Sequence, residues 1–184
     1  AALSANETTL PALQRHLRSI NVPFSIVLPD SSVLLCTDML RLLPGKRMVM
    51  RAEHRGNTVL AKLFFDTRHL QKELEGYVLL RKTGVATPTL LVDERIGQGG
   101  ICLYQFIDHA VALDTLWQQS GTAKKLSLLK KLLPALQLCY QQQVLQKDLH
   151  LGNFLWRDDT VWVLDPASCS TFKKANSRPP FWPK

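Results

Sequence analysis

Long apolar runs are absent from this sequence. No stretch of about 18 consecutive apolar residues occurs, so we expect no transmembrane helix. The opening residues, AALSANETT, contain neither the basic segment nor the apolar core of a secretory leader, so we expect no signal peptide there, and the first residue is not a methionine. Internal repeats and low-complexity segments are also absent. A globular chain is therefore the expectation.

Paired cysteines and glycine-rich phosphate loops are equally scarce. The four cysteines, Cys36, Cys102, Cys139 and Cys169, are far apart, and none forms the CxxC pair that would favour a zinc site. Their apolar neighbours predict buried thiols and a reducing, cytoplasmic compartment. The glycine-rich run IGQGG (96–100) lies between two strand-like segments, whereas a phosphate-binding glycine loop leads from a strand into a helix. We therefore interpret it as a hairpin turn.

The composition is that of a basic globular protein. Its 184 residues carry a formal net charge of +8, and 46% of them are hydrophobic. That length fits one domain, or two small lobes, with a sizeable core. The positive charge favours an anionic partner such as nucleotide phosphates, nucleic acid, an anionic membrane surface or a phosphorylated glycolipid, although scattered surface lysines and arginines account for it equally well. Because the basic residues are not interleaved with aromatic ones, we expect no nucleic acid as partner.

The first half of the chain is predicted to form strands and one helix. Apolar patterning predicts strands over residues 24–28 and 32–36, and a hairpin over residues 46–65 that turns at Arg55-Gly56-Asn57. Asp66 or Thr67 can cap a helix that runs to about Lys82 and ends at Gly84. Strands over residues 89–94 and 101–107 follow. The apolar stripe expected on the helix consists of Leu70, Leu74, Tyr77 and Val78.

The second half is predicted to be mainly helical. Helices are expected over residues 113–119 and 122–142, and Pro134 should kink or split the second one. Two strands follow around a turn at residues 157–159. A further helix over residues 8–20 either packs on the body of the protein or rests on a membrane surface as a basic amphipathic helix. The apolar face expected for residues 122–142 consists of Leu126, Leu129, Leu133, Leu136 and Tyr140.

A lysine in an apolar strand is the first candidate site residue. Lys62 lies within VLAKLFF, and burying an unpaired ammonium group is costly. It therefore needs an anionic partner, unless the strand is at a sheet edge and the lysine faces water. Glu73 in the following helix could pair with it. Glu75 is the competing candidate, but it should point about 200° away from Glu73 around the helix.

The segment QKDLHLGN (146–153) holds the second group of candidates. Asp148 and Asn153 are five residues apart with His150 between them, and Asp165 ends the apolar strand that follows. Asn153 and Asp165 carry oxygen ligands suited to magnesium, which keeps several waters, so that two protein ligands suffice. Asp148 could then act as the base or orienting group for an incoming hydroxyl. Together with the lysine and glutamate upstream, these residues fit phosphoryl transfer, which requires positioning and charge neutralisation.

In combination these segments resemble the protein-kinase-like superfamily. QKDLHLGN is similar to its catalytic loop, VWVLDPAS (161–168) to its metal-binding segment and VLAK (59–62) to its nucleotide-lysine strand. The histidine of DLHLGN resembles the small-molecule branch, which includes aminoglycoside and choline kinases. Two further segments resemble the bacterial lipopolysaccharide-core kinases, which phosphorylate heptose or 3-deoxy-D-manno-octulosonic acid. They are KELEGYVLLRKTGVATP (72–88) and YQFIDHAVALDTLW (104–117). The first of them is also similar to the RIO kinases. The resemblance covers about residues 40–170.

For nucleotide binding, the resemblance implies roles for five residues. Lys62 would contact the α- and β-phosphates of ATP, and Glu73 would pair with Lys62. The backbone of Gln105, Phe106 and Ile107 would hold the adenine.

For catalysis, the resemblance implies that Asp148 is the catalytic aspartate and that Asn153 and Asp165 bind Mg²⁺. The sequence departs from the family pattern at Gln146, where the family usually has histidine, and in the phosphate-loop region LLPGKR, which has a single glycine, Gly45. The family also adds further helices after this segment, and about nineteen residues follow Asp165 here. We therefore expect a short C-terminal lobe.

The expected fold class is α+β. It would be a protein-kinase-like two-lobed fold, with an antiparallel-sheet N-lobe carrying one helix over residues 1–107 and a truncated, mainly helical C-lobe over residues 108–184. The expected function is ATP- and Mg²⁺-dependent phosphorylation of a sugar hydroxyl of lipopolysaccharide core, an anionic glycolipid acceptor, in the cytoplasm and peripheral to the inner membrane. Two alternatives stay open: a kinase-like enzyme acting on a small molecule or a protein hydroxyl, and a non-catalytic kinase-like binding or regulatory protein.

Overall fold

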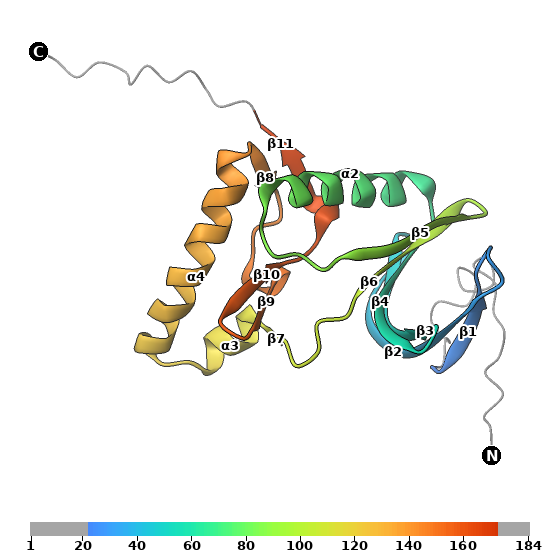
Figure 1. Ribbon diagram of the computed structural model, residues 1–184, viewed down its shortest axis with the longest axis horizontal. Helices are drawn as coiled ribbons and strands as arrows, with labels where there is room; N and C mark the ends of the chain where they lie inside the picture. Colours follow the sequence, from blue (N-terminus) through green and yellow to red (C-terminus); the bar gives the residue numbers. More distant parts are fainter. Residues whose placement is uncertain (1–21, 173–184) are drawn as a thin grey trace, which may run out of the picture. The chain divides into compact units, whose positions relative to one another are not determined.

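The computed structural model describes residues 22–172, drawn in colour in Figure 1. The expected helix over residues 8–20 lies outside the described residues. The described chain divides into two compact units, which we call the N-terminal unit (residues 22–72 and 88–109) and the C-terminal unit (residues 73–87 and 110–172). The expected boundary at residue 107 stays a prediction, and residues 73–87 belong by their contacts to the C-terminal unit.

The N-terminal unit is built on a six-stranded antiparallel sheet in the order β1-β2-β3-β4-β6-β5. Figure 1 shows that the sheet is curled. Two register shifts in the β2–β3 pairing contribute to this shape, because bulges increase the local twist of a strand. The fully buried side chains of the unit include Leu34, Met48, Met50 and Leu63. The strands are β1 (Phe24–Val27), β2 (Val33–Leu43), β3 (Arg47–His54), β4 (Asn57–Phe64), β5 (Leu90–Ile96) and β6 (Gly99–Gln105).

Turn chemistry explains the hairpins of this sheet. Arg55 and Gly56 connect β3 to β4 with φ angles of 49° and 78°, the positive pair that a two-residue type I′ turn requires. Gly97, with φ of 57°, opens the turn between β5 and β6. The predicted hairpins over residues 46–65 and around IGQGG are therefore confirmed, as is the strand pair around Asp30.

Helix α2 (Thr67–Thr83) begins where the sequence predicted. The Asp66 carboxylate accepts a hydrogen bond from the backbone N–H of His69 at 2.8 Å, and this bond lowers the pKa of Asp66 below its usual value. The helix ends at Gly84, which has a positive φ of 78°.

The predicted apolar stripe of α2 is partly wrong. Val78, placed on the buried face by its hydrophobicity, is half exposed. The face that is buried instead runs through Leu70, Glu73, Gly76 and Leu80, spaced at three or four residues. A buried glutamate and a glycine thus occupy two of the four positions.

The C-terminal unit combines two helices with short strands. The helices are α3 (Leu113–Gln119) and α4 (Thr122–Gln141). Strands β7 (Val111–Ala112), β9 (Phe154–Arg157) and β10 (Thr160–Val163) form one sheet in the order β10-β9-β7, and β8 (Val144–Gln146) pairs with β11 (Cys169–Thr171). Residues 86 and 87 join β10: Val163 donates its N–H to the carbonyl of Ala86 at 2.8 Å, and Thr87 donates its hydroxyl to the carbonyl of Val163 at 2.9 Å.

Helix α4 differs from its prediction in the face that it buries. It runs as one element through Pro134, so of the two predicted effects of the proline, splitting does not occur. Its buried side chains are Leu128, Leu132 and Cys139. The predicted apolar face is the neighbouring one: Leu129 and Leu136 are half-buried, while Leu126, Leu133 and Tyr140 are exposed.

The fold class is α+β, with a curled antiparallel sheet and three helices in the described part of the chain. None of the helices within residues 22–172 is long and apolar enough to cross a membrane. All four cysteines lie in this range and none is in a disulfide. Cys36, Cys102 and Cys139 are buried as predicted, whereas Cys169 is partly exposed.

Candidate active site

The segment predicted as a catalytic loop connects β8 to β9 in the C-terminal unit. Its last residues, Leu151–Asn153, form one turn of 3₁₀ helix. The buried side chain of Asn153 turns back along the loop, and its Nδ2 donates to the carbonyl of Asp148 at 2.7 Å. The Asp148 carboxylate itself is exposed. The buried Asn153 amide therefore closes the loop, while the Asp148 carboxylate is exposed to solvent.

His150 lies beside this acid. Its Nε2 is 3.5 Å from Oδ2 of Asp148. A Cβ atom at Gly152 would lie 3.1 Å both from Nδ1 of His150 and from Oδ2 of Asp114, in the first turn of α3. His150 thus contacts Asp148 and lies across Gly152 from Asp114. Sequence reasoning missed Asp114, because a single acid at the start of a short helix carries no motif.

Asp165 lies directly after β10 in a left-handed conformation, with φ of 55° and ψ of 64°. Such backbone is uncommon for a residue other than glycine and is frequently found at functional sites. The carbonyl of Asp165 accepts from the N–H and the hydroxyl of Ser168 at 3.2 and 3.0 Å, which closes the turn. One residue earlier, Leu164 donates its N–H to the carbonyl of Asn153 at 2.8 Å. This bond brings the two predicted magnesium ligands onto neighbouring segments.

Gln146 also links the loop 146–153 to the segment 164–168, through its side chain. Its Nε2 donates to the carbonyl of Leu164 at 2.7 Å. The adjacent Lys147 N–H donates to the carbonyl of Ser168 at 2.9 Å. The residue that departs from the family pattern therefore anchors the backbone immediately before Asp165. Its Oε1 is buried and has no hydrogen-bond partner among the described residues.

Gly76 sets the distance between α2 and the segment after Asp165. A Cβ atom at this position would lie only 1.7 Å from the carbonyl oxygen of Pro166. No larger residue fits there without displacing one of the two backbones. The helix therefore supports the Pro166–Ser168 turn through backbone contact, for which a glycine is needed.

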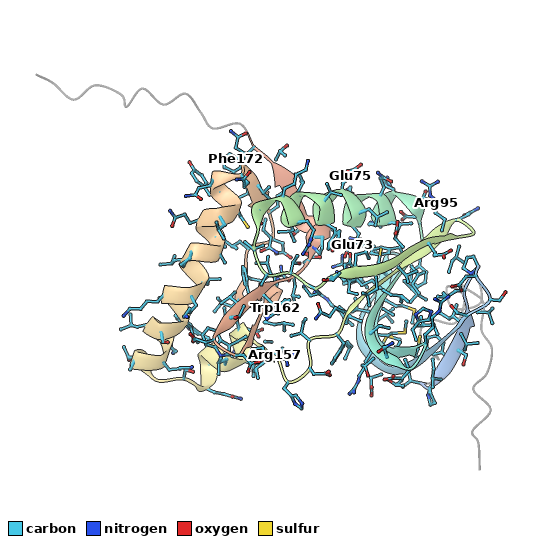
Figure 2. All side chains as sticks on the ribbon, viewed as in Figure 1. Glu73, Glu75, Arg95, Arg157, Trp162 and Phe172 are labelled. Atoms are coloured by element: carbon cyan, nitrogen blue, oxygen red, sulfur yellow. The ribbon has the colours of Figure 1, made fainter. Side chains whose placement is uncertain are left out.

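Glu73 and Glu75 lie on different sides of α2. Figure 2 labels both and shows them on opposite sides of the helix, as the predicted angle of about 200° requires. Glu73 has no exposed surface, whereas Glu75 is exposed. The pairing of Glu73 with Lys62 stays a prediction.

Lys62 belongs to the N-terminal unit. It lies in β4, with Val49 of β3 and Cys102 of β6 as its cross-strand neighbours, and is only 8% exposed. Its Nζ is 5.2 Å from the centre of the Tyr104 ring. The alternative of an edge-strand lysine facing water is wrong, because β4 is an inner strand.

The segment predicted to hold adenine follows β6 in the N-terminal unit. Gln105 is exposed, Phe106 is half-buried and Ile107 is buried. The N–H of Gln105 already donates to the carbonyl of Thr89 at 2.8 Å, so an adenine would have to use other backbone groups of this segment. The guanidinium of Arg51 lies 5.2 Å from the centre of the Phe106 ring.

The predicted site residues therefore belong to two groups. Lys62 and residues 105–107 lie in the N-terminal unit. Glu73, Asp148, Asn153 and Asp165 lie in the C-terminal unit.

The donor chemistry of the C-terminal group fits magnesium. An amide oxygen and a carboxylate are hard ligands, and Mg²⁺ is usually held by one or two such groups with water and phosphate oxygens completing its shell. Because Nδ2 of Asn153 donates to Asp148, the carboxamide oxygen is the atom left for a cation. Within residues 22–172 no three histidine, cysteine or carboxylate side chains gather into a group that could hold a metal ion.

Comparison with other proteins adds no family assignment. The chain matches no protein-family model and no curated protein.

Proposed function

We propose that this protein is an ATP- and Mg²⁺-dependent phosphotransferase with a two-lobed, protein-kinase-like fold. The observation that supports this most is the bonding between the loop 146–153 and the segment 164–168. Asn153 donates to Asp148, Leu164 donates to Asn153, and Gln146 donates to Leu164, at 2.7, 2.8 and 2.7 Å. An acid, an amide and a second acid are thereby held on adjoining backbones, which is the arrangement that in-line phosphoryl transfer requires.

In the C-terminal unit each residue has a defined task. The exposed Asp148 carboxylate accepts a hydrogen bond from the acceptor hydroxyl, orients its oxygen and receives its proton. Asn153 and Asp165 would hold Mg²⁺, which supplies charge neutralisation at the β- and γ-phosphate oxygens when bound. Asp165 has left-handed backbone, and Ser168 keeps the turn that follows it closed.

In the N-terminal unit the buried Lys62 is the cation proposed for the α- and β-phosphates. A buried ammonium group gains most from an anion because little water screens it. Glu73 is proposed as the carboxylate that orients Lys62. The backbone after β6, at Gln105, Phe106 and Ile107, is proposed to hold the adenine.

The proposed acceptor is a sugar hydroxyl of lipopolysaccharide core. The net charge of +8 favours an anionic acceptor, and such a glycolipid would bring the protein to the cytoplasmic face of the inner membrane. A small-molecule or protein hydroxyl is the alternative acceptor. A panel of heptose-containing glycolipids, aminoglycosides, choline and protein substrates with labelled ATP distinguishes these acceptors.

Nucleotide-dependent stabilisation tests the proposal. Mg-ATP should raise the melting temperature of the intact chain, and Asp165→Asn should abolish this shift, because asparagine tolerates the left-handed backbone but lacks the charge. Asp158→Asn is the matched control, since Asp158 is an exposed acid in the β9–β10 turn that also has a positive φ. A parent protein that Mg-ATP does not stabilise would refute the proposal. Stabilisation without turnover on any acceptor would favour the non-catalytic alternative.

A further inference from the structure

Helix α4 presents a second apolar face that the described part of the unit contacts only at its end, where the Tyr140 ring centre lies 5.1 Å from that of Phe172. Leu126, Leu133 and Tyr140 recur at seven-residue intervals and are 54%, 59% and 58% exposed. The half-buried Leu129 and Leu136 lie between them, so the spacing alternates between three and four residues. That alternation is the seam by which one helix packs against another. We call these five residues the α4 seam.

Beside the α4 seam lies an apolar cavity of about 210 Å³. Leu136 and Tyr140 of the seam line it, together with Leu145 and Leu149, which are also exposed. Exposed apolar surface that is continuous over a helix and a cavity is characteristic of an interaction site. The cavity is large enough to take one bulky side chain of a partner.

One polar residue lines this otherwise apolar cavity. The side chain of Gln146 is buried, and its Oε1 has no hydrogen-bond partner among the described residues. Leaving such an acceptor unsatisfied costs about 1–3 kcal/mol. Because this oxygen has almost no accessible surface, the Gln146 side chain must first pivot toward the cavity; a side chain that enters with an apolar body and a single donor, as the indole of tryptophan or the phenol of tyrosine has, would then satisfy it.

The charges on α4 indicate which charge a partner would carry beside its apolar residues. The helix carries Lys124, Lys125, Lys130 and Lys131 and no acidic residue. On a helical wheel Lys125 and Lys130 lie on either side of the seam. A second copy of the same helix would bring lysine against lysine, whereas acidic side chains would be attracted.

We propose that the α4 seam and its cavity form the docking site for an amphipathic helix of a partner protein, acidic beside its apolar face and anchored by one tryptophan or tyrosine. This inference does not depend on the phosphotransferase proposal, because none of the seam residues touches the proposed reacting groups. The partner's apolar residues would pack along Leu126, Leu133 and Tyr140, its anchor would fill the cavity, and the anchor's donor would bond to Gln146.

Synthetic helices of roughly 21 residues test this, since shorter ones are marginal in water. The first peptide has a leucine seam, glutamates beside it and one tryptophan. The second replaces the glutamates by lysines, and the third replaces the tryptophan by phenylalanine. Binding to the intact chain is measured by fluorescence anisotropy. We expect the lysine peptide to bind at least about tenfold more weakly than the first and the phenylalanine peptide about fivefold to tenfold more weakly.

A pair of protein variants locates the binding. Leu133→Asn should weaken the first peptide at least about tenfold, because it places an amide in the seam. Leu91→Asn in β5 is the control, as its 55% exposure is close to the 59% of Leu133. Both variants should keep the parent melting temperature.

Several results would overturn the proposal. Equal binding of the three peptides, or loss of binding in Leu91→Asn alone, would refute the assigned site. Dimers that Leu133→Asn dissociates would show that a second copy covers the seam. Flotation with vesicles containing phosphatidylglycerol, lost in Leu133→Asn, would assign the seam to a membrane surface instead.

Discussion

Gly76→Ala is the sharpest test of how α2 supports the segment after Asp165. The added Cβ would lie 1.7 Å from the carbonyl oxygen and 2.5 Å from the carbonyl carbon of Pro166. Both are backbone atoms, so no side-chain rotation relieves the overlap. The Pro166 backbone would have to retreat by roughly 1.5 Å, and overpacking of this kind typically costs about 1–3 kcal/mol.

Helix propensity opposes that cost. Alanine is favoured over glycine inside a helix by about 1 kcal/mol. Because the clash is with main chain and well inside contact distance, we take the upper end of the overpacking range and expect a net loss of about 2 kcal/mol. The Mg-ATP stabilisation should fall as well, because Asp165, a proposed magnesium ligand, directly precedes the displaced Pro166.

Urea unfolding followed by tryptophan fluorescence measures this loss. Three of the four tryptophans, Trp117, Trp156 and Trp162, lie in the C-terminal unit with Gly76. The fourth, Trp182, is outside the described residues, so the parent and the variants all carry Trp182→Phe and the signal then reports on that unit. Gly121→Ala is the control for adding a methyl group without a clash, because a Cβ there meets nothing within 4 Å. Gly121 is the N-cap of α4, where alanine is disfavoured, so this variant should lose no more than about 1 kcal/mol. If Gly76→Ala were as stable as the parent, or gained the 1 kcal/mol expected of an open helical site, the reasoning about Pro166 would be refuted.

Three further perturbations give expected outcomes. Asp66→Ala should destabilise the chain by about 1 kcal/mol at neutral pH. Because the pKa of Asp66 is lowered from 3.8, its stabilising contribution is present above pH 3.8 and is lost as the pH falls through the folded-state pKa. Asp66→Asn should remove this pH dependence of stability in acid titrations. Iodoacetamide should alkylate Cys169 first in the folded protein, while Cys36, whose pKa burial raises to about 12, should react only after unfolding, as peptide mass mapping would show. Gln146→Met leaves the Leu164 carbonyl without this donor and removes the unsatisfied Oε1, two effects of opposite sign, so the free energy of unfolding in urea should change by less than about 1 kcal/mol. The Mg-ATP shift should weaken, and an unchanged shift would contradict the positioning role of Gln146.

Local chemistry was sufficient to predict the hairpins and the start of α2. Arg55-Gly56, the IGQGG run and Asp66 each act on their own few residues, so their effects can be inferred without knowing the rest of the fold. The burial of Lys62 could also be predicted, because apolar residues before and after a lysine in a strand indicate a buried strand.

The buried faces of the helices could not be predicted in this way. The face of α2 contains Glu73 and Gly76, and hydrophobic periodicity assigns neither of them to a core. Helix α4 carries two apolar faces, and periodicity finds the more regular one, which the unit leaves exposed at Leu126 and Leu133. In both helices the packing partner decides which face is buried, and that partner is distant in sequence.

The bonding of the loop 146–153 to the segment 164–168 also has a consequence for local opening. The amide hydrogens of Lys147, Asn153 and Leu164 are donated to Ser168, His150 and Asn153, so each is released only when its acceptor moves. Because Asn153 is donor in one bond and acceptor in another, movement of its backbone breaks both bonds together. The amides of Asn153 and Leu164 should therefore exchange with deuterium together, with similar protection factors, rather than in the graded order of a fraying loop.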